Sequence, residues 1–269
     1  MIEVRPLSGS IGAAVTGISL GDLGELGDLN DGRFSAIRDA FLANCMLVFP
    51  GQHLSVARFE AFSKLWGEPV TSSFLEYIEG HHGVSKLFNR GKSKSVTENW
   101  HSDTPFLPEP PSINLLSALH MPVGGDTMWC NQYLAYETLS SGMQQMLCGL
   151  KIEFNGDSLA GLTGRVEDFR SCHPVVRTHP ETGRKSLFVG PPTITARRFE
   201  HMTEEESFPL LHWLHQHSFQ PHRVYRHHWS DGDVVMWDNR CTLHYAVHDH
   251  GEDAERELYR ITTRAEKPV

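Results

Sequence analysis

Four segments carry apolar residues at the three- and four-residue spacing that is typical of amphipathic helices. These predicted helices span residues 33–44, 55–65, 131–150 (with a break at Ser140) and 203–217. The last of them has a clear start signal, because Glu206 follows Thr203 at the spacing of a capping box. Helices therefore account for only part of the chain.

Short apolar runs between Gly and Pro turns are more frequent, and they predict strands. The expected strands are residues 2–6, 11–20, 46–49, 84–88 and 113–120, a short run after Thr127, a hairpin at 174–189, and runs at 223–228, 234–237, 241–244 and 258–263. Residues 21–31 and 151–172 are polar and are expected to be connections. The pattern favours an antiparallel double-sheet fold that is mainly β with flanking helices, in one domain over residues 1–269. We favour the jelly roll.

The composition fits an ordinary globular protein of 269 residues, with 39% hydrophobic and 21% charged residues. A formal net charge of -9 argues against nucleic acid as a partner. The longest apolar runs, such as Cys45–Phe49, are too short to span a membrane. The N-terminus has no secretory signal pattern, and the five cysteines form no C-x-x-C pair, so a reducing, cytoplasmic location is expected.

The stretch Asn99-Trp-His-Ser-Asp103 is the strongest chemical signal in the chain. In an extended strand, His101 and Asp103 point to the same face, with backbones about 6 to 7 Å apart. A second histidine would complete the two-histidine, one-carboxylate set of non-haem Fe(II) oxygenases. The pair alone is a weak signal, because so short a pattern recurs by chance in many proteins, and the two side chains could instead form a structural hydrogen bond.

The C-terminal part of the chain supplies the missing groups. His244 lies in a predicted strand, and Arg256 and Arg260 follow it closely. An oxygenase that uses 2-oxoglutarate needs three ligands on one face of the metal and a cation for the distal carboxylate of the keto acid. Arginine binds a carboxylate through two parallel hydrogen bonds.

These residues carry a family resemblance. The motifs are Asn99–Asp103, the turn Gly124-Gly-Asp-Thr127, Trp237–Arg240 with His244–Val247, the pair Arg256 and Arg260, and the N-terminal stretch Pro6–Leu20. Together they resemble the taurine dioxygenase / 2,4-dichlorophenoxyacetate dioxygenase (TauD/TfdA) family nearly end to end.

The resemblance implies a double-stranded β-helix (jelly roll, cupin-like) that uses Fe(II), 2-oxoglutarate and O2. The implied roles are iron ligation by His101, Asp103 and His244, binding of 2-oxoglutarate by Thr127 and Arg256, substrate binding by Arg260, and a place near the iron for Trp237. The implied reaction hydroxylates a small organic anion, such as a sulfonate, a sulfate ester or an aryloxy or alkyl carboxylate, and releases succinate and CO2. Hydroxylation beside a heteroatom would lead to C–S or C–O cleavage. A homodimer or homotetramer is also implied.

Other interpretations stay open at this point. The substrate could be a zwitterion or a carrier-bound acid of a biosynthetic pathway. The chain could instead be a non-catalytic jelly-roll module that binds a metal or ligand, or an isomerase or hydrolase with another metal. Arg256 and Arg260 could face solvent and pair with nearby acidic residues, and Thr127 and Trp237 could be ordinary strand and core residues.

Two further groups of residues have weaker interpretations. Candidate apolar lining of the pocket consists of Phe74, Tyr77, Phe106 and Leu107, with lid residues expected in 70–97 and 155–172. The histidines expected on the surface are His212, His215, His227, His228, His248 and His250; among these, His212 and His215 have a spacing that would also suit zinc.

Overall fold

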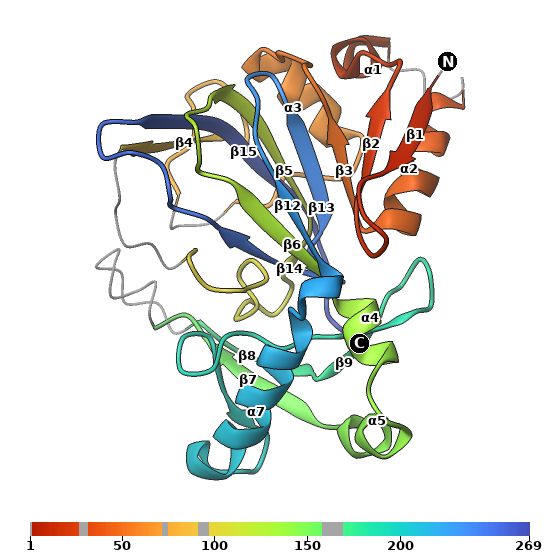
Figure 1. Cartoon of the computed structure of the whole chain (residues 1–269), viewed down its shortest axis with the longest axis vertical. Coiled ribbons are helices and arrows are strands. Elements are labelled where there is room, and N and C mark those ends of the chain that lie inside the picture. Colours follow the sequence, from red (N-terminus) through yellow and green to blue (C-terminus); the bar gives the residue numbers. More distant parts are fainter. Residues whose placement is uncertain (1, 27–31, 72–74, 91–96, 158–168) are drawn as a thin grey trace.

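The computed structural model describes residues 2–26, 32–71, 75–90, 97–157 and 169–269 (Figure 1). The helices are α1 (Leu20–Leu26), α2 (Arg33–Asn44), α3 (Val56–Lys64), α4 (Gln132–Glu137), α5 (Ser141–Leu147), α7 (Glu204–Ser218) and the 3-10 helix η1 (Pro221–Arg223). The strands are β1 (Glu3–Pro6), β2 (Ala13–Thr16), β3 (Met46–Phe49), β4 (Ser85–Arg90), β5 (Pro111–His120), β6 (Thr127–Asn131), β7 (Lys151–Asn155), β8 (Arg170–Pro174), β9 (Val176–Thr178), β10 (Lys185–Leu187), β11 (Ala196–Phe199), β12 (Val224–His227), β13 (Val234–Asp238), β14 (Thr242–Ala246) and β15 (Glu255–Ala265).

The larger layer of the fold is a sheet with the strand order β1-β2-β3-β13-β5-β15-β4. Its pairs are antiparallel except for β2 and β3. A smaller sheet has the order β12-β6-β14 and is also antiparallel. The predicted mainly β, double-sheet fold is confirmed.

Alternation along β13 shows how the two layers are packed. Val234 and Met236 belong to the core between the larger sheet and the N-terminal helices, together with Phe41 and Phe59. The alternate residues Val235 and Trp237 belong to a second core that includes Trp129 of the smaller sheet. Because successive strand residues point to opposite faces, one strand supplies both cores. The second core lies between the two sheets, and the candidate site is at its edge.

Helix α1 corrects one prediction, because residues 21–31 were expected to be a loop. Residues 20–26 form a helix, while 27–31 lie outside the described residues. Leu20 and Leu23 are buried in the N-terminal core, and the side chain of Gln52 accepts a hydrogen bond from the Leu20 backbone N–H at 2.9 Å. A seven-residue helix rich in Gly and Asp is not stable alone, so tertiary packing stabilises it.

The segment 151–172 corrects a second prediction. It was expected to be a polar connection, but β7 lies between β11 and β8 in a separate antiparallel sheet (Figure 1). Ile152 and Phe154 are buried there, Lys151 is exposed, and Glu153 between the two apolar residues is partly exposed. The alternation covers only five residues, too few to stand out from a polar loop. Residues 158–168 of the segment lie outside the described part.

The remaining predicted elements are confirmed with shifted ends. The 131–150 helices are α4 and α5, the hairpin at 174–189 contains β9 and β10, and α7 begins with the complete capping box of Thr203 and Glu206. Within the described residues, no helix is both long and apolar enough to cross a membrane. All five cysteines are free thiols, three of them buried.

Candidate active site

The two histidines of the predicted triad are paired through their backbones. His101 and His244 form an isolated antiparallel bridge, in which the His101 N–H donates to the His244 carbonyl at 3.0 Å and the reverse bond is 2.8 Å. The two imidazole centroids lie 4.1 Å apart. His244 is carried by β14 of the smaller sheet, and His101 by the segment that crosses beside it. This bridge therefore brings together two histidines that are 143 positions apart in the chain.

Asp103 completes the cluster. Its Oδ1 lies 3.8 Å from Nε2 of His101 and 3.9 Å from Nε2 of His244. The three ligand atoms lie within 4.8 Å of one another, close enough for one metal ion to contact all of them. The next residue, Thr104, has a positive φ of 44°. A β-branched residue in this conformation is strained, and such strain is often found at functional sites.

The protonation of these groups suits a metal ligand set. The Nδ1 of His101 lies 2.6 Å from the Asn99 carbonyl oxygen and donates to it, so Nε2 is the ring nitrogen left to face a metal ion. Burial, reinforced by His101, lowers the pKa of His244 to about 3, so this imidazole is neutral at pH 7. Burial opposes ionisation of Asp103, but Arg260 and the two imidazoles hold its pKa well below the usual range.

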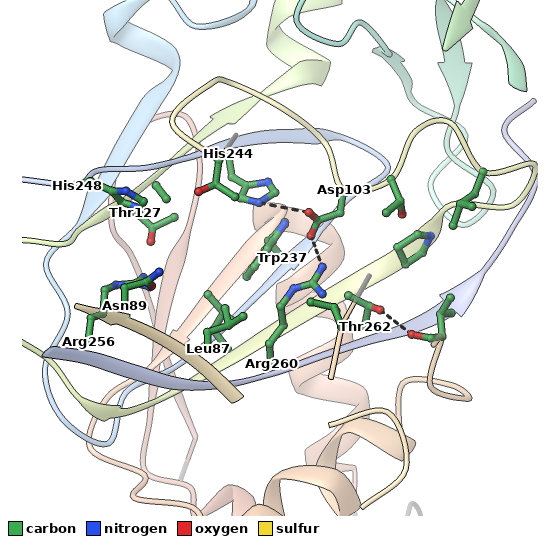
Figure 2. A pocket seen from close by; sticks show the side chains of 18 residues that line it. Leu87, Asn89, Asp103, Thr127, Trp237, His244, His248, Arg256, Arg260 and Thr262 are labelled. Carbon is green, nitrogen blue, oxygen red and sulfur yellow. Dashed lines mark hydrogen bonds and ion pairs between the residues drawn. The ribbon is translucent and has the colours of Figure 1, made fainter. Parts of the chain in front are cut away.

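A cavity of about 290 Å³, which we call the central cavity, opens beside the triad (Figure 2). It is lined by Val70, Leu75, Leu87, Asn89, Thr97, Asp103, Thr104, Leu107, Pro111, Leu116, Thr127, Trp237, His244, Ala246, His248, Arg256, Arg260 and Thr262. Figure 2 shows Arg256, Asn89 and Thr127 toward one end, with Asp103 and Arg260 away from them. The structure thus brings all six predicted site residues to one place.

Arg256 is a buried guanidinium that forms no ion pair with a carboxylate of the described residues. Only 5% of Arg256 is exposed; its Nε donates to the Gly125 carbonyl at 3.0 Å, and its Nη1 lies 3.5 Å from Oδ1 of Asn89. Burial lowers its pKa to about 10, so it is still charged at pH 7. The carboxylate of Asp126 favours the charged form, but it is paired with Arg226 and His228. Arg256 therefore has no carboxylate in direct contact, which makes this end of the cavity a site for an anion.

Gly125 allows Arg256 to approach the loop before β6. Its φ is +72°, and a Cβ built on it would lie 3.1 Å from Cδ of Arg256. Any other residue would be strained and would crowd the guanidinium stem. At the end of this loop, Oγ1 of Thr127 accepts a hydrogen bond from Nε1 of Trp229 at 3.0 Å. A hydroxyl held in this way keeps its own proton for a ligand in the cavity.

Arg260 and Trp237 form the wall nearest the triad. Nη2 of Arg260 donates to Oδ2 of Asp103 at 3.0 Å, which leaves other N–H groups of this guanidinium for a second anion. The Trp237 ring lies 4.9 Å from the His244 ring, and Trp237 is 1% exposed. Trp237 is therefore a core residue that also forms part of the cavity wall.

A second, smaller cavity lies on the other side of Asp103. It measures about 100 Å³, and we call it the Phe106 cavity. Its lining is formed by Thr97, His101, Ser102, Asp103, Thr104, Pro105, Phe106, Gly156, Pro191, Ile194 and Thr195. Most of these side chains present carbon to the space. Of the predicted apolar lining, Phe106 lines this cavity and Leu107 the central one; Tyr77 lines neither, and Phe74 lies outside the described residues.

Four histidines expected at the surface are buried instead. The exposed fractions are 8% for His215, 6% for His227, 0% for His250 and 5% for the His248 side chain. His215 donates through Nε2 to the Trp100 carbonyl at 2.8 Å, whereas His212 is exposed, so these two do not form a zinc site. The prediction failed because a local sequence pattern cannot show which side chains a distant segment covers.

Three asparagines at the site were missed by sequence reasoning. Asn89 contacts Arg256, and Asn114 and Asn239 both donate hydrogen bonds to Asp103. Asn114 is a polar residue within an otherwise apolar strand, a signal that could have revealed it. Asn89 carries no comparable signal in the sequence.

Comparison with known proteins adds to this geometry. Residues 3–262 match the family described as "Taurine catabolism dioxygenase TauD, TfdA family". The chain belongs to the TauD/TfdA family. It is similar to an alkylsulfatase of Acinetobacter baylyi, with 33% identity over 282 residues that cover 98% of this chain and 86% of the relative.

Other TauD/TfdA proteins agree with this assignment. An alpha-ketoglutarate-dependent 2,4-dichlorophenoxyacetate dioxygenase of Cupriavidus pinatubonensis is 36% identical over 245 residues, which cover 81% of this chain and 84% of the relative. The crystal structure of a taurine dioxygenase from Burkholderia xenovorans superposes with a TM-score of 0.86 and 33% identity, and covers 100% of this chain and 92% of that one. The TauD/TfdA chain described here is a 2-oxoglutarate-dependent non-haem iron dioxygenase with a jelly-roll fold, as the sequence predicted.

Proposed function

We propose that this dioxygenase hydroxylates a small organic anion that has an apolar body and no ammonium group. One observation carries the proposal: the triad opens on a cavity that also contains Arg256, a buried cation without a carboxylate partner. Three side chains that could bind one metal ion would suit many kinds of protein. A metal-binding triad beside a buried cation that can bind an anion suits an enzyme that binds a keto acid next to its metal.

We assign the iron to Nε2 of His101, Oδ1 of Asp103 and Nε2 of His244. The fit rests on the donor set, two imidazoles and an ionised carboxylate, and on the hydrogen bond from His101 Nδ1 to Asn99 that directs Nε2 toward the ion. Bound iron would supply the activation of O2. One oxygen atom would be used to oxidise 2-oxoglutarate to succinate and CO2, and the other to hydroxylate the substrate. The protein binds, orients and shields the reactants.

We assign the distal carboxylate of 2-oxoglutarate to Arg256 and Thr127. Both line the same end of the central cavity, and each has hydrogen-bonding capacity left after its protein contacts. A carboxylate there neutralises the buried guanidinium and forms charge-assisted hydrogen bonds with it.

We assign the anionic group of the substrate to Arg260. This side chain reaches the cavity beside the triad, and Asp103 occupies only its Nη2 atom. The apolar body would lie in the Phe106 cavity, where Phe106, Pro191 and Ile194 present apolar surface next to His101 and Asp103. An organic sulfate, sulfonate or carboxylate with a short alkyl or aryl group has this combination of properties.

The lining also argues against the zwitterionic substrates considered above. Among the described lining residues of both cavities, Asp103 is the only carboxylate, and it is committed to the triad and Arg260. A substrate ammonium group would therefore be desolvated without a counterion, which is unfavourable. Alkyl sulfates and aryloxy acids avoid this cost.

The net reaction follows from the position of the new hydroxyl. Hydroxylation of the carbon that bears a sulfate or aryloxy oxygen gives an unstable intermediate. It breaks down to a carbonyl compound and the released sulfate or phenol, so C–O cleavage is the expected outcome. A sulfonate would lose sulfite in the same way, with C–S cleavage.

Succinate production tests the proposal. The purified protein is incubated with Fe(II), ascorbate, O2 and 2-oxoglutarate, and with alkyl sulfates, aryloxyalkanoates, alkylsulfonates, taurine or betaines. We expect succinate to rise with one of the first three classes and to stay at background with the zwitterions. His101→Ala is the matched negative control, because it removes one ligand from the triad. Turnover confined to taurine or betaines would contradict the substrate proposal.

We further propose that the enzyme is a single domain in the cytoplasm and assembles as a homodimer or homotetramer. Five free thiols support a reducing compartment, and the resemblance to the family supports the assembly. Light scattering on the eluting protein measures the assembly directly; a mass of one chain would contradict it.

A further inference from the structure

We propose that Asn114 and Asn239 are positioning residues that hold Asp103 so that only one of its carboxylate oxygens faces the metal. The inference rests on the proposed function, because it takes Asp103 as a metal ligand. The two asparagines come from different parts of the fold: Asn114 from the middle of β5, and Asn239 from the turn between β13 and β14. Both are buried, with 0% and 1% exposure.

Asn239 holds the main chain of Asp103. Its Oδ1 accepts from the Asp103 N–H at 2.8 Å, and its Nδ2 donates to the Asp103 carbonyl at 3.1 Å. The same Nδ2 also donates to the Pro111 carbonyl at 2.9 Å, and the backbone N–H of Asn239 donates to the Ser112 carbonyl at 2.8 Å. One side chain thus joins the Asp103 loop to the start of β5 and fixes the loop at the residue that carries the carboxylate.

Asn114 holds the carboxylate itself. Its Nδ2 donates to Oδ2 of Asp103 at 2.9 Å, and Arg260 donates to the same oxygen at 3.0 Å. The opposite orientation of the amide would bring two acceptor oxygens together, so the donor must face Asp103. With Oδ2 taken by two donors, Oδ1 is the oxygen left to face His101 and His244, at 3.8 and 3.9 Å. A carboxylate held in this way binds a metal through one oxygen.

The sheet register explains why Asn114 can reach this place. Asn114 pairs with Trp237 of β13 and with Thr262 of β15. Residues directly opposite each other on antiparallel strands point to the same face, and both of these partners line the central cavity. Asn114 therefore points toward the cavity side of the sheet, where Asp103 lies.

The energetics of Asn114 indicate a role other than stability. Among the described residues, its buried Oδ1 has no hydrogen-bond partner. A buried acceptor without a partner destabilises the fold and offsets what the bond to Asp103 contributes, so an apolar residue of similar size should change the stability little. A residue that is unfavourable for folding and bonded to a metal ligand is expected where function requires it.

The consequence for the reaction concerns open coordination positions. A carboxylate that bound through both oxygens would occupy a position that 2-oxoglutarate, O2 or water needs. By holding Oδ2 away, Asn114 keeps the site at three protein contacts. Asn239 keeps the loop from moving Asp103 out of reach of the two imidazoles.

Co(II) binding to the Asn114→Leu variant tests this inference without turnover. Partners that orient metal ligands typically contribute about 10- to 100-fold to metal affinity. We expect Co(II) affinity to fall by that factor, with a changed visible absorption spectrum, because Oδ2 of Asp103 then keeps only its bond to Arg260 and is held less firmly away from the metal. The thermal midpoint of the metal-free variant should stay close to that of the wild type. Ser117→Ala is the control, since Ser117 is another buried polar residue of β5 whose Oγ has no partner among the described residues.

The outcomes separate the two proposals. Wild-type affinity and an unchanged spectrum in Asn114→Leu would overturn the role of Asn114, and an equal loss in Ser117→Ala would reduce it to general packing. If the wild type itself binds no Co(II), the proposed function fails first. Should Asn114→Leu not fold, Asn114→Ser is measured by the same criteria, because its smaller side chain fits the same space and is too short to reach Oδ2.

A second variant tests Asn239. Asn239→Ser loses the two bonds to the Asp103 main chain together with the bond to Pro111. We expect weaker Co(II) binding and also lower stability of the metal-free protein, in contrast to Asn114→Leu. Unchanged Co(II) affinity in Asn239→Ser would overturn its role.

Discussion

Two arginines on one strand illustrate how residue chemistry depends on surroundings. Arg256 and Arg260 both lie on β15 and both line the central cavity. Arg260 already contacts a carboxylate, that of Asp103, whereas among the described residues Arg256 donates hydrogen bonds only to neutral groups, those of Gly125 and Asn89. The charge of Arg260 is therefore stabilised within the protein, and Arg256 is available to bind an anion. Their different surroundings support different assignments.

Replacing Arg256 should separate cofactor binding from stability. Loss of charge-assisted hydrogen bonds worth about 1.5 to 3 kcal/mol should raise the Kd for 2-oxoglutarate about 10- to 150-fold in Arg256→Met. The metal-free variant should be as stable as the wild type or more stable, because an unneutralised buried charge has been removed. Anaerobic titration of the Fe(II) protein with 2-oxoglutarate measures the Kd. Arg264→Met, half-exposed on the same strand, is the control and should bind 2-oxoglutarate normally.

Replacing Arg260 should affect the substrate more than the co-substrate. In Arg260→Ala the anionic group loses its cation, so KM for the substrate should rise about 10- to 100-fold. The Kd for 2-oxoglutarate should change little, because Arg256 and Thr127 remain. Steady-state kinetics with the best compound of the succinate assay gives the first quantity, and the anaerobic titration gives the second. Equal losses in both would contradict the separation of roles.

At the scale of single elements, helix α7 shows how a surface element supports the site. Its N-terminus is closed by the capping box of Thr203 and Glu206, and its inner face buries Leu211 and Leu214. Near its C-terminal end, His215 donates to the carbonyl of Trp100, the residue that precedes His101. The helix thus contacts the triad segment directly through a histidine that burial keeps neutral.

This histidine gives the fold a predictable response to acid. Burial lowers the pKa of His215 below its ordinary value of 6.5. The folded state therefore binds fewer protons than the unfolded state below about pH 6.5, and stability decreases as the pH falls, by at most about 1.4 kcal/mol per pH unit for this group. Above that pH the effect disappears. Buried His173, with its pKa also lowered by burial, acts in the same direction.

Thermal unfolding of the metal-free protein at pH 7.5 and pH 5.5 measures this effect. His215→Gln keeps a donor for the Trp100 carbonyl but cannot take up a proton, so its midpoint should fall less than that of the wild type. His212→Gln, exposed on the same helix, should follow the wild type. Parallel decreases in all three proteins would show that His215 does not contribute.

At the scale of the whole molecule, a buried ionic network joins distant segments beside the site. Arg240, in the turn that also carries Asn239, forms two hydrogen bonds to Asp238 at 2.7 and 2.8 Å. It also reaches Glu181 of the β9–β10 hairpin at 2.8 Å and Glu266 near the C-terminus at 3.3 Å. The guanidinium is 0% exposed. The turn is therefore held from both the hairpin and the C-terminal segment.

The periphery of this network extends to the N-terminal helices. Arg38 of α2 also pairs with Glu181, and Asp238 contacts His179 at 2.9 Å. Burial opposes ionisation of Asp238, but Arg240 outweighs it and holds the pKa of this carboxyl well below the usual range. Asp238 thus stays charged at pH 7, and the network depends on Arg240.

Removing the central cation should destabilise the entire fold. Arg240→Met leaves three carboxylates without their shared partner, and breaking a buried ion pair costs about 3 to 5 kcal/mol. Arg264→Met removes a half-exposed partner of Glu181 and should cost about 1 kcal/mol or less. Urea unfolding of the metal-free proteins gives both values. A similar small loss in both variants would show that burial adds nothing to the Arg240 network.

The sequence by itself determined much of this protein. Periodicity located α2, α3, α7 and the strands of both main sheets, because local patterns of burial repeat at the period of each element. The resemblance of its motifs to the TauD/TfdA family placed His101, Asp103, His244, Thr127, Arg256 and Arg260 in one candidate site. Such residues are recognisable because their chemistry restricts the residue type at each position.

Only the tertiary structure decided what depends on contacts between distant segments. The backbone bridge of His101 and His244, the burial of Arg256, the burial of His215 and His250, and the helix at 20–26 all arise from neighbours far away in the chain. The bonds from Asn114 and Asn239 to Asp103 belong to the same class. The local pattern of apolar and polar residues indicates whether a segment is a helix or a strand. Burial and hydrogen-bond partners depend on the complete tertiary structure.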